Sequence, residues 1–180
     1  MKFGDLYVES SRNGLTKPRA IRGSGIRFIN MGELFESDWI GDTAADRVPV
    51  TANEKRTALL REGDLLFARQ SLVREGAGKC SIVTKINEPT TFDSHLIRVR
   101  LCQEKANPYF YQYFFRSPLS PMPGIVSQCA QAGIKGSDLE RLEVPCPPLE
   151  EQNRIASVLQ VYDNLIENNR SQIALLEEAA

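Results

Sequence analysis

The C-terminal segment 149–180 limits what this chain can form more than any other feature, because its 32 residues include neither glycine nor proline. Glu150 and Glu151 stand in the first turn, where the helix dipole favours acidic side chains. The preceding residues 144–148 hold three prolines and predict an extended connector. We therefore predict a domain over residues 1–146, followed over residues 147–180 by a helix that extends for roughly 45 to 50 Å.

Apolar side chains in this helix recur at heptad spacing, which is typical of a helix that pairs with another in a coiled coil. Asn169 lies on the same stripe, where a polar residue costs stability but favours one register of pairing. The alternative is a helix that packs back on its own domain. The stripe predicted to contact a partner helix comprises Ile155, Val158, Leu159, Tyr162, Leu165, Ile166, Asn169, Ile173 and Leu176.

Residues 1–146 mix the patterns of strands and helices. Thr51 is a suitable N-cap for a helix over 51–60, and Asn107 followed by Pro108 predicts the start of an aromatic-rich helix over 109–116. Short alternating segments bounded by Gly, Asn or Pro predict strands. We therefore expect an α/β or α+β domain with mixed or antiparallel strands and short helices. The predicted strands lie at residues 25–30, 64–69, 80–85 and 95–101.

The composition is that of a globular protein, with 42% hydrophobic and 25% charged residues. Because the chain lacks an apolar run of bilayer-spanning length and an apolar leader, we expect a cytoplasmic protein without membrane contact. A net charge of -1 argues against a general polyanion binder, yet residues 1–149 hold 20 of the 22 basic and 17 of the 23 acidic residues. Neither a zinc site nor a disulfide framework is indicated by the scattered positions of Cys80, Cys102, Cys129 and Cys146.

Two runs of sequence carry a resemblance to a known family. The run PPLEEQNRIA at 147–156 closely resembles the helix start of type I restriction-modification specificity (S) subunits, and GDLLFAR at 63–69 resembles the central strand of their target-recognition domains. Family members usually carry two recognition domains and two long helices that pair as an antiparallel coiled coil. This chain has one of each, so the resemblance predicts a half-length subunit, either natural or truncated.

The resemblance implies a non-catalytic DNA-binding subunit that reads one half of a bipartite site in double-stranded DNA. It further implies docking to methyltransferase (M) subunits, which methylate adenine with S-adenosylmethionine. The full complex would also contain a restriction (R) subunit that depends on ATP and Mg. No cofactor and no metal is expected on this chain. The missing second half favours a homodimer, or pairing with a second half-subunit, through the C-terminal helix. The alternative is a helix-pairing scaffold without a DNA role.

Three groups of residues are candidates for contact with DNA. Residues 12–27 hold five basic residues and no acid, which suits contacts to phosphates. Arginine and glutamine after the strand at 63–69 suit base recognition in the major groove. For each group the alternative is an ordinary solvated loop. The candidates are Arg12, Lys17, Arg19 and Arg22, with Arg27 beside them, then Arg69, Gln70, Arg74 and Lys79, and finally Gln131 and Lys135.

The sequence offers no catalytic site. Residues 107–110 resemble the active-site tetrapeptide of adenine methyltransferases with one proline missing, but the proline stands where a helix would begin, and no Gly-rich cofactor loop is present. His95 is the single histidine and is interpreted as a structural residue at the start of a strand. A P-loop and a nucleophile elbow are absent, so enzyme hypotheses lack a site.

Overall fold

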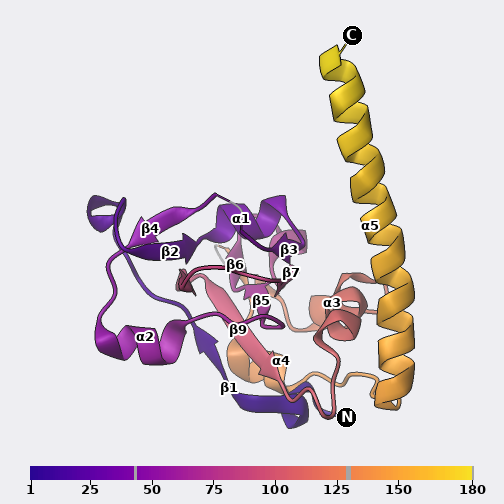
Figure 1. Ribbon diagram of the computed structural model, residues 1–180. Coiled ribbons are helices and arrows are strands. Elements are labelled where there is room, and N and C mark those ends of the chain that lie inside the picture. Colours follow the sequence, from indigo (N-terminus) through magenta and orange to yellow (C-terminus); the bar gives the residue numbers. More distant parts are fainter. Residues whose placement is uncertain (43, 129–130, 180) are drawn as a thin grey trace.

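The computed structural model describes residues 1–42, 44–128 and 131–179 (Figure 1). Among these residues, a five-stranded sheet with the order β1-β9-β5-β7-β3 forms the centre of the N-terminal domain. Neighbouring strands are antiparallel except β3 and β7, which are parallel. The strands are β1 (Tyr7–Asn13), β9 (Leu96–Leu101), β5 (Leu65–Ala68), β7 (Cys80–Val83) and β3 (Trp39–Ile40).

Both faces of this sheet are buried, which explains why its central strands are almost continuously apolar. Leu65 and Phe67 of β5 point into one core, which is completed by the aromatic helix α3 (Pro108–Arg116). Leu66 and Ala68 point into a second core with Leu34 of the helix α1 (Met31–Glu36). The alternation along β5 follows from the two-residue period of a strand.

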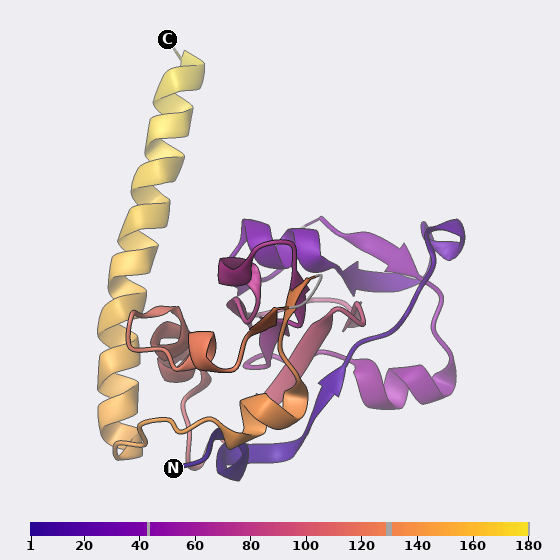
Figure 2. The ribbon, with the colours of Figure 1, turned by 180° about the vertical axis from the view of Figure 1, so that it is seen from behind.

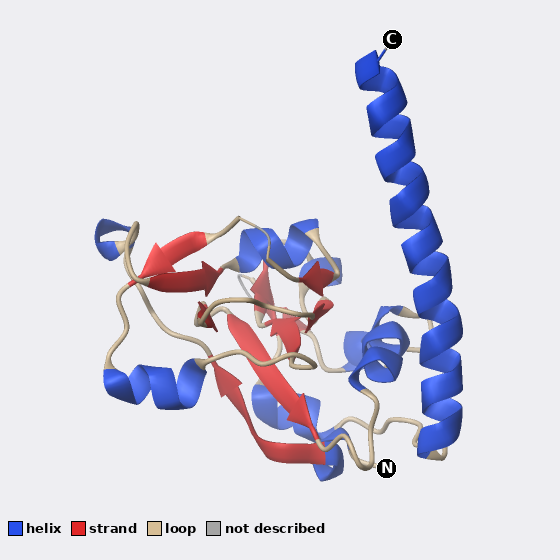
Figure 3. Cartoon of the chain, in the orientation of Figure 1, coloured by secondary structure: helices blue, strands red, loops and turns tan. Residues whose placement is uncertain are grey.

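Two small sheets flank the central one, and short helices connect them, as Figure 3 shows. The predicted mixed α/β class is confirmed, and the strands predicted at 25–30, 64–69, 80–85 and 95–101 correspond to β2, β5, β7 and β9. The sheets are β4 (Asp46–Val48), β2 (Ile26–Ile29) and β8 (Thr90–Phe92), and β10 (Ser127–Gln128), β11 (Ala132–Gly133) and β6 (Gln70–Ser71). The short helices are η1 (Phe3–Leu6), η2 (Arg19–Ile21), α2 (Ala52–Ala58), η3 (Arg74–Gly76), η4 (Met122–Gly124) and α4 (Gly136–Arg141).

The predicted helix starts are confirmed by their caps. The Thr51 side chain accepts a hydrogen bond from the backbone N–H of Glu54, and the Glu54 side chain accepts one from the backbone N–H of Thr51. Asn107 caps α3 by accepting from the backbone N–H groups of residues 109 and 110, with Pro108 in the first turn. Pro108 therefore stands at the helix start, where the sequence predicted it.

The helix α5 (Leu149–Ala179) packs on the domain along its N-terminal half, as far as Asp163, and residues 164–179 are exposed. The buried Gln152 side chain accepts from the backbone N–H of Asn107 and donates to two carbonyl oxygens, and Ala156 is also buried. Figures 1 and 2 show the C-terminal half of α5 extending beyond the domain. Ile155 packs against the first core, so this one residue of the predicted pairing stripe contacts its own domain.

Some simpler findings bear on the expected class of protein. In the described part of the chain, no helix is long and apolar enough to span a membrane. The same residues contain no cluster of three or more His, Cys, Asp or Glu side chains that could hold a metal ion. Cys80, Cys102 and Cys146 are free thiols, and Cys129 lies outside the described residues.

Candidate nucleic-acid interface

One edge of the central sheet gathers residues that are far apart in the sequence. β1 and β5 end at this edge and β9 begins there, because the three strands are antiparallel. Arg12 lies opposite Arg98 near the end of β1, and the backbone N–H of Arg69 donates to the carbonyl oxygen of His95 at 2.8 Å. We call the edge formed by Arg12, Arg69 and His95, together with the adjoining β6–β11 pair, the rim.

Arg69 is the centre of this rim. Its Nη1 donates to the Ser94 carbonyl oxygen at 3.1 Å, which orients the guanidinium, and its own carbonyl accepts from the backbone N–H of Ile134. Among the described residues, no partner is found for the Nη2 and Nε of Arg69, so these donors remain available to a ligand.

Pairing of β6 with β11 brings the second and third candidate groups together. Gln70 lies opposite Gly133, and residues on both sides of β11 flank the rim. Gln131 and Lys135 are exposed there, and a Cβ on Gly136 would lie 2.7 Å from Ser11 Oγ, next to Arg12. Two groups separated by about sixty positions in the sequence therefore share one surface.

Arg74 and Lys79 lie farther along the loop and are engaged differently. Arg74 is exposed at the start of η3, with Nη2 donating to the Pro123 carbonyl oxygen at 3.3 Å. Lys79 donates to the Phe35 carbonyl oxygen at 2.8 Å and lies 3.6 Å from Asp38. The Lys79 ammonium therefore holds the end of α1 against the sheet.

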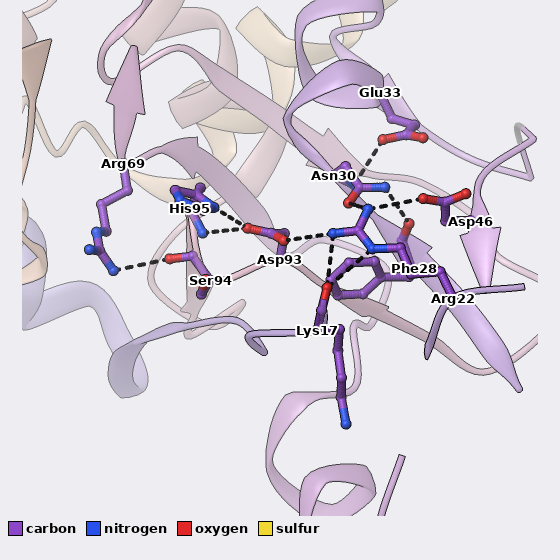
Figure 4. A network of polar contacts seen from close by, with 10 residues as sticks. All are labelled: Lys17, Arg22, Phe28, Asn30, Glu33, Asp46, Arg69, Asp93, Ser94 and His95. Atoms are coloured by element: carbon purple, nitrogen blue, oxygen red, sulfur yellow. Dashed lines mark hydrogen bonds and ion pairs between the residues drawn. The ribbon is translucent and has the colours of Figure 1, made fainter. Parts of the chain in front are cut away.

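Arg22 anchors the basic segment rather than presenting its charge to solvent, as Figure 4 shows. Its guanidinium donates twice to the Lys17 carbonyl oxygen at 3.1 Å, and lies 5.0 Å from the centre of the Phe28 ring. It also donates to Asn30 Oδ1 at 2.8 Å and forms ion pairs with Asp46 and Asp93 at 3.0 and 3.7 Å. This network fixes the path of residues 14–25.

Lys17 is likewise paired within the domain, because its Nζ lies 2.9 Å from Glu54 Oε1. The backbone N–H of Thr51, followed by the Lys17 ammonium, lowers the pKa of Glu54. Arg27 is buried and contacts the Gly41 carbonyl oxygen and Asp42. By contrast Arg12 and Arg19 are exposed, and neither side chain has a hydrogen-bond or ion-pair partner among the described residues.

A cavity of about 660 Å³ opens beside the rim. Its wall includes Arg19, Arg22 and the pair Asp93 and His95. A side chain on Gly14 would overlap the carbonyl oxygens of Phe92 and Asp93, so glycine allows the basic segment to pass this close.

His95, interpreted from the sequence as a structural residue at the start of a strand, lies close to that position. It stands one residue before β9, and its side chain is 54% exposed. The sequence does contain a signal for a surface turn, namely Asp93. An aspartate side chain often closes a turn by accepting a hydrogen bond from the backbone N–H two residues later. Asp93 Oδ1 does accept from the backbone N–H of His95, at 2.8 Å.

Comparison with known protein families shows which family this chain belongs to. The model of the type I restriction modification DNA specificity domain matches residues 12–178. The chain belongs to this family. It is 34% identical over 159 residues to the specificity subunit of the type I restriction enzyme EcoKI from Escherichia coli K12, covering 86% of this chain and 34% of that protein. It is 26% identical over 166 residues to the MjaIX specificity subunit of Methanocaldococcus jannaschii, covering 92% of this chain and 37% of that one.

Solved structures of specificity subunits share the fold. The HsdS subunit from Thermoanaerobacter tengcongensis matches 96% of this chain with a TM-score of 0.64 and 18% identity, and the S subunit from M. genitalium matches 95% with a TM-score of 0.64 and 15% identity. The chain covers 39% and 40% of those two proteins, and about a third of the length of the two curated relatives named above.

Proposed function

We propose that this specificity-domain chain recognises one half of a bipartite site in double-stranded DNA, as a non-catalytic part of a type I restriction-modification complex. The observation that carries the proposal is the rim, where Arg12, Arg69 and Gln70 meet from separate segments, beside Gln131 and Lys135. An edge rich in basic and amide side chains matches the chemistry of phosphates and base edges.

The residues of the rim and of the neighbouring basic segment have different roles in this proposal. Arg12 and Arg19 are exposed and unpaired within the described structure, so they neutralise phosphates and supply salt-dependent affinity. Arg69 is held at one nitrogen by Ser94, which suits a directed contact to guanine, and Gln70 has the amide that pairs with adenine. Lys17, Arg22 and Lys79 support the surface without contacting DNA, since their charges are paired inside the domain.

The free part of α5 is the proposed contact with a second recognition unit. Most of its predicted stripe is exposed, including Leu165 at 53% and Leu176 at 69%. At about 100° per residue, this stripe lies roughly a third of a turn from the face that carries Gln152, Ala156 and Asp163. The helix can therefore pack on its domain and pair with another helix at the same time. The partner is a second copy of this chain or another half-subunit.

The wider assembly is proposed by analogy with the relatives. M subunits would bind S-adenosylmethionine and methylate adenine, while an R subunit would use ATP and Mg²⁺, in the cytoplasm.

Selection from a randomised duplex pool tests the proposal. The chain is incubated with the pool at two salt concentrations, with and without co-purified M subunits, and the bound sequences are read. We expect enrichment of a split motif in the presence of M subunits. Uniform binding that depends only on salt, or no binding, would instead support a helix-pairing scaffold.

A further inference from the structure

Asp93 and His95 form a pair on the turn between β8 and β9, and in this pair the donor and the acceptor can be identified. Asp93 Oδ1 lies 2.5 Å from His95 Nδ1, and the Asp93 side chain is only 10% exposed. The other oxygen of Asp93 faces the Arg22 guanidinium at 3.7 Å. Because a carboxylate oxygen accepts hydrogen bonds, Nδ1 is the ring nitrogen that bears a hydrogen.

The opposite ring nitrogen is consequently an acceptor. When the imidazole carries one proton and that proton is on Nδ1, Nε2 presents a lone pair. The His95 side chain is 54% exposed at the cavity mouth, and Nε2 has no hydrogen-bond partner within the described structure. Figure 4 shows the ring held at one side by Asp93, while Arg69 lies on the other side of Ser94.

The phosphates of DNA can only accept hydrogen bonds, so they cannot pair with an acceptor such as Nε2. The amino groups of adenine (N6) and cytosine (N4) donate hydrogen bonds in the major groove. We propose that His95 is a specificity-determining residue whose Nε2 accepts a hydrogen bond from the amino group of an adenine or cytosine, with Asp93 as its positioning residue. This inference rests on the proposed function. Arg69, whose backbone pairs with that of His95, supplies the complementary donor, so neighbouring side chains read opposite polarities of base edge.

The test compares variants in the same pool selection, with M subunits present and at pH 8. We expect His95→Ala to reduce the preference for adenine or cytosine at one position by about 5- to 150-fold, which corresponds to about 1 to 3 kcal/mol. Preferences at the other positions and binding to non-specific duplex should be unchanged. Asp93→Asn should relax the same position, since an amide can also donate to Nδ1 and convert Nε2 to a donor. Lys85→Ala, on an exposed residue beyond the other end of β7, is the matched control.

Three outcomes would overturn the inference. His95→Ala could select the same motif with unchanged preferences at every position, it could lose affinity equally for all sequences as a phosphate contact would, or Asp93→Asn could leave unchanged the position that His95→Ala relaxes. These results would leave the proposed function intact, because the wild-type chain would still select a motif. A wild-type chain that selects none would overturn the proposed function, and this inference with it.

Discussion

The hydroxyl of Tyr113 on α3 donates a hydrogen bond of 2.7 Å to Asp163, more than three turns into α5. Together with Gln152 at the start of the helix, this contact holds α5 against α3 at two points. The direction in which the free half of α5 leaves the domain is therefore fixed by side chains of the domain. In a pairing of two such helices, this direction would set the separation of the two rims.

Removing the hydroxyl should loosen the helix. Burial, followed by the hydrogen bond to Asp163, raises the pKa of Tyr113, as expected for a phenol that donates to a carboxylate. We predict that Tyr113→Phe lowers the free energy of unfolding in urea by about 1 kcal/mol, because the contact is only partly shielded from water. The matched control is Tyr162→Phe, on a 62% exposed residue of α5, which should change stability by less than about 0.5 kcal/mol. Equal losses in both variants would contradict the anchoring role.

A buried carboxylate just before β5, at the opposite end of that strand from the rim, should matter more. Asp64 is fully buried and forms a two-point contact with Arg100, at 2.7 Å for both oxygens. We predict that Asp64→Asn costs about 2 kcal/mol in urea unfolding, because it removes the buried one of the two carboxylates that pair with Arg100, and only Glu9, at 2.6 Å, remains. Glu167→Gln removes one member of an exposed pair with Arg170 and should cost less than about 0.5 kcal/mol. A cost for Asp64→Asn as small as that control would show that the pair is not structural.

The free energy of unfolding should decline at alkaline pH, in part because of the buried phenol of Tyr7. Burial, followed by the nearby Glu140 and Cys80, raises the pKa of Tyr7, whose hydroxyl has no hydrogen-bond partner among the described residues. An unfolded tyrosine loses its proton near pH 10. Above that pH the unfolded state alone is deprotonated, so this stabilising contribution is intact below about pH 10 and is lost as the pH rises.

Replacing the phenol tests that assignment. We expect Tyr7→Phe to reduce the slope of unfolding free energy against pH between about 10 and 11.5, measured by urea unfolding at each pH, while the other groups with raised pKa, such as Tyr111 and Tyr113, keep the rest of the slope. Near pH 7 the variant should be as stable as the wild type or more stable by up to about 1 kcal/mol, because an unsatisfied buried hydroxyl is removed. An unchanged alkaline slope would assign the decline to other groups.

Local signals in the sequence were sufficient to predict the helices and strands. They were insufficient to predict which basic side chains are paired within the domain. Thr51 and the Asn107–Pro108 pair act on backbone groups within three residues, so their capping roles could be predicted. Lys17 is neutralised by a glutamate 37 positions away, and Lys79 donates to a carbonyl 44 positions away. A run of basic residues does not reveal such partners, which only the folded chain brings close. The heptad pattern similarly could not show that Ile155 faces its own domain.

The exposed stripe of α5 predicts self-association that depends on its apolar side chains. Leu165→Glu combined with Ile166→Glu should abolish pairing in sedimentation experiments, because both side chains lie on the stripe and outside the domain core. Thermal unfolding of the domain should be unchanged. Ser171→Glu adds charge on the opposite side of the helix and should pair normally. A wild-type chain that stays monomeric at high concentration, both alone and with M subunits, would contradict the proposed pairing.

The most direct test of the account compares Arg69→Ala with Arg12→Ala in binding to the selected duplex and its single-base variants across salt concentrations. If the rim reads DNA as proposed, Arg69→Ala loses about 1 to 3 kcal/mol of discrimination at one base position and keeps the salt slope of the wild type. Arg12→Ala should weaken binding to all sequences equally and reduce the salt slope by about 1. Unchanged affinity and unchanged base preference in both variants would contradict the central claim that this edge of the sheet is the DNA-reading surface.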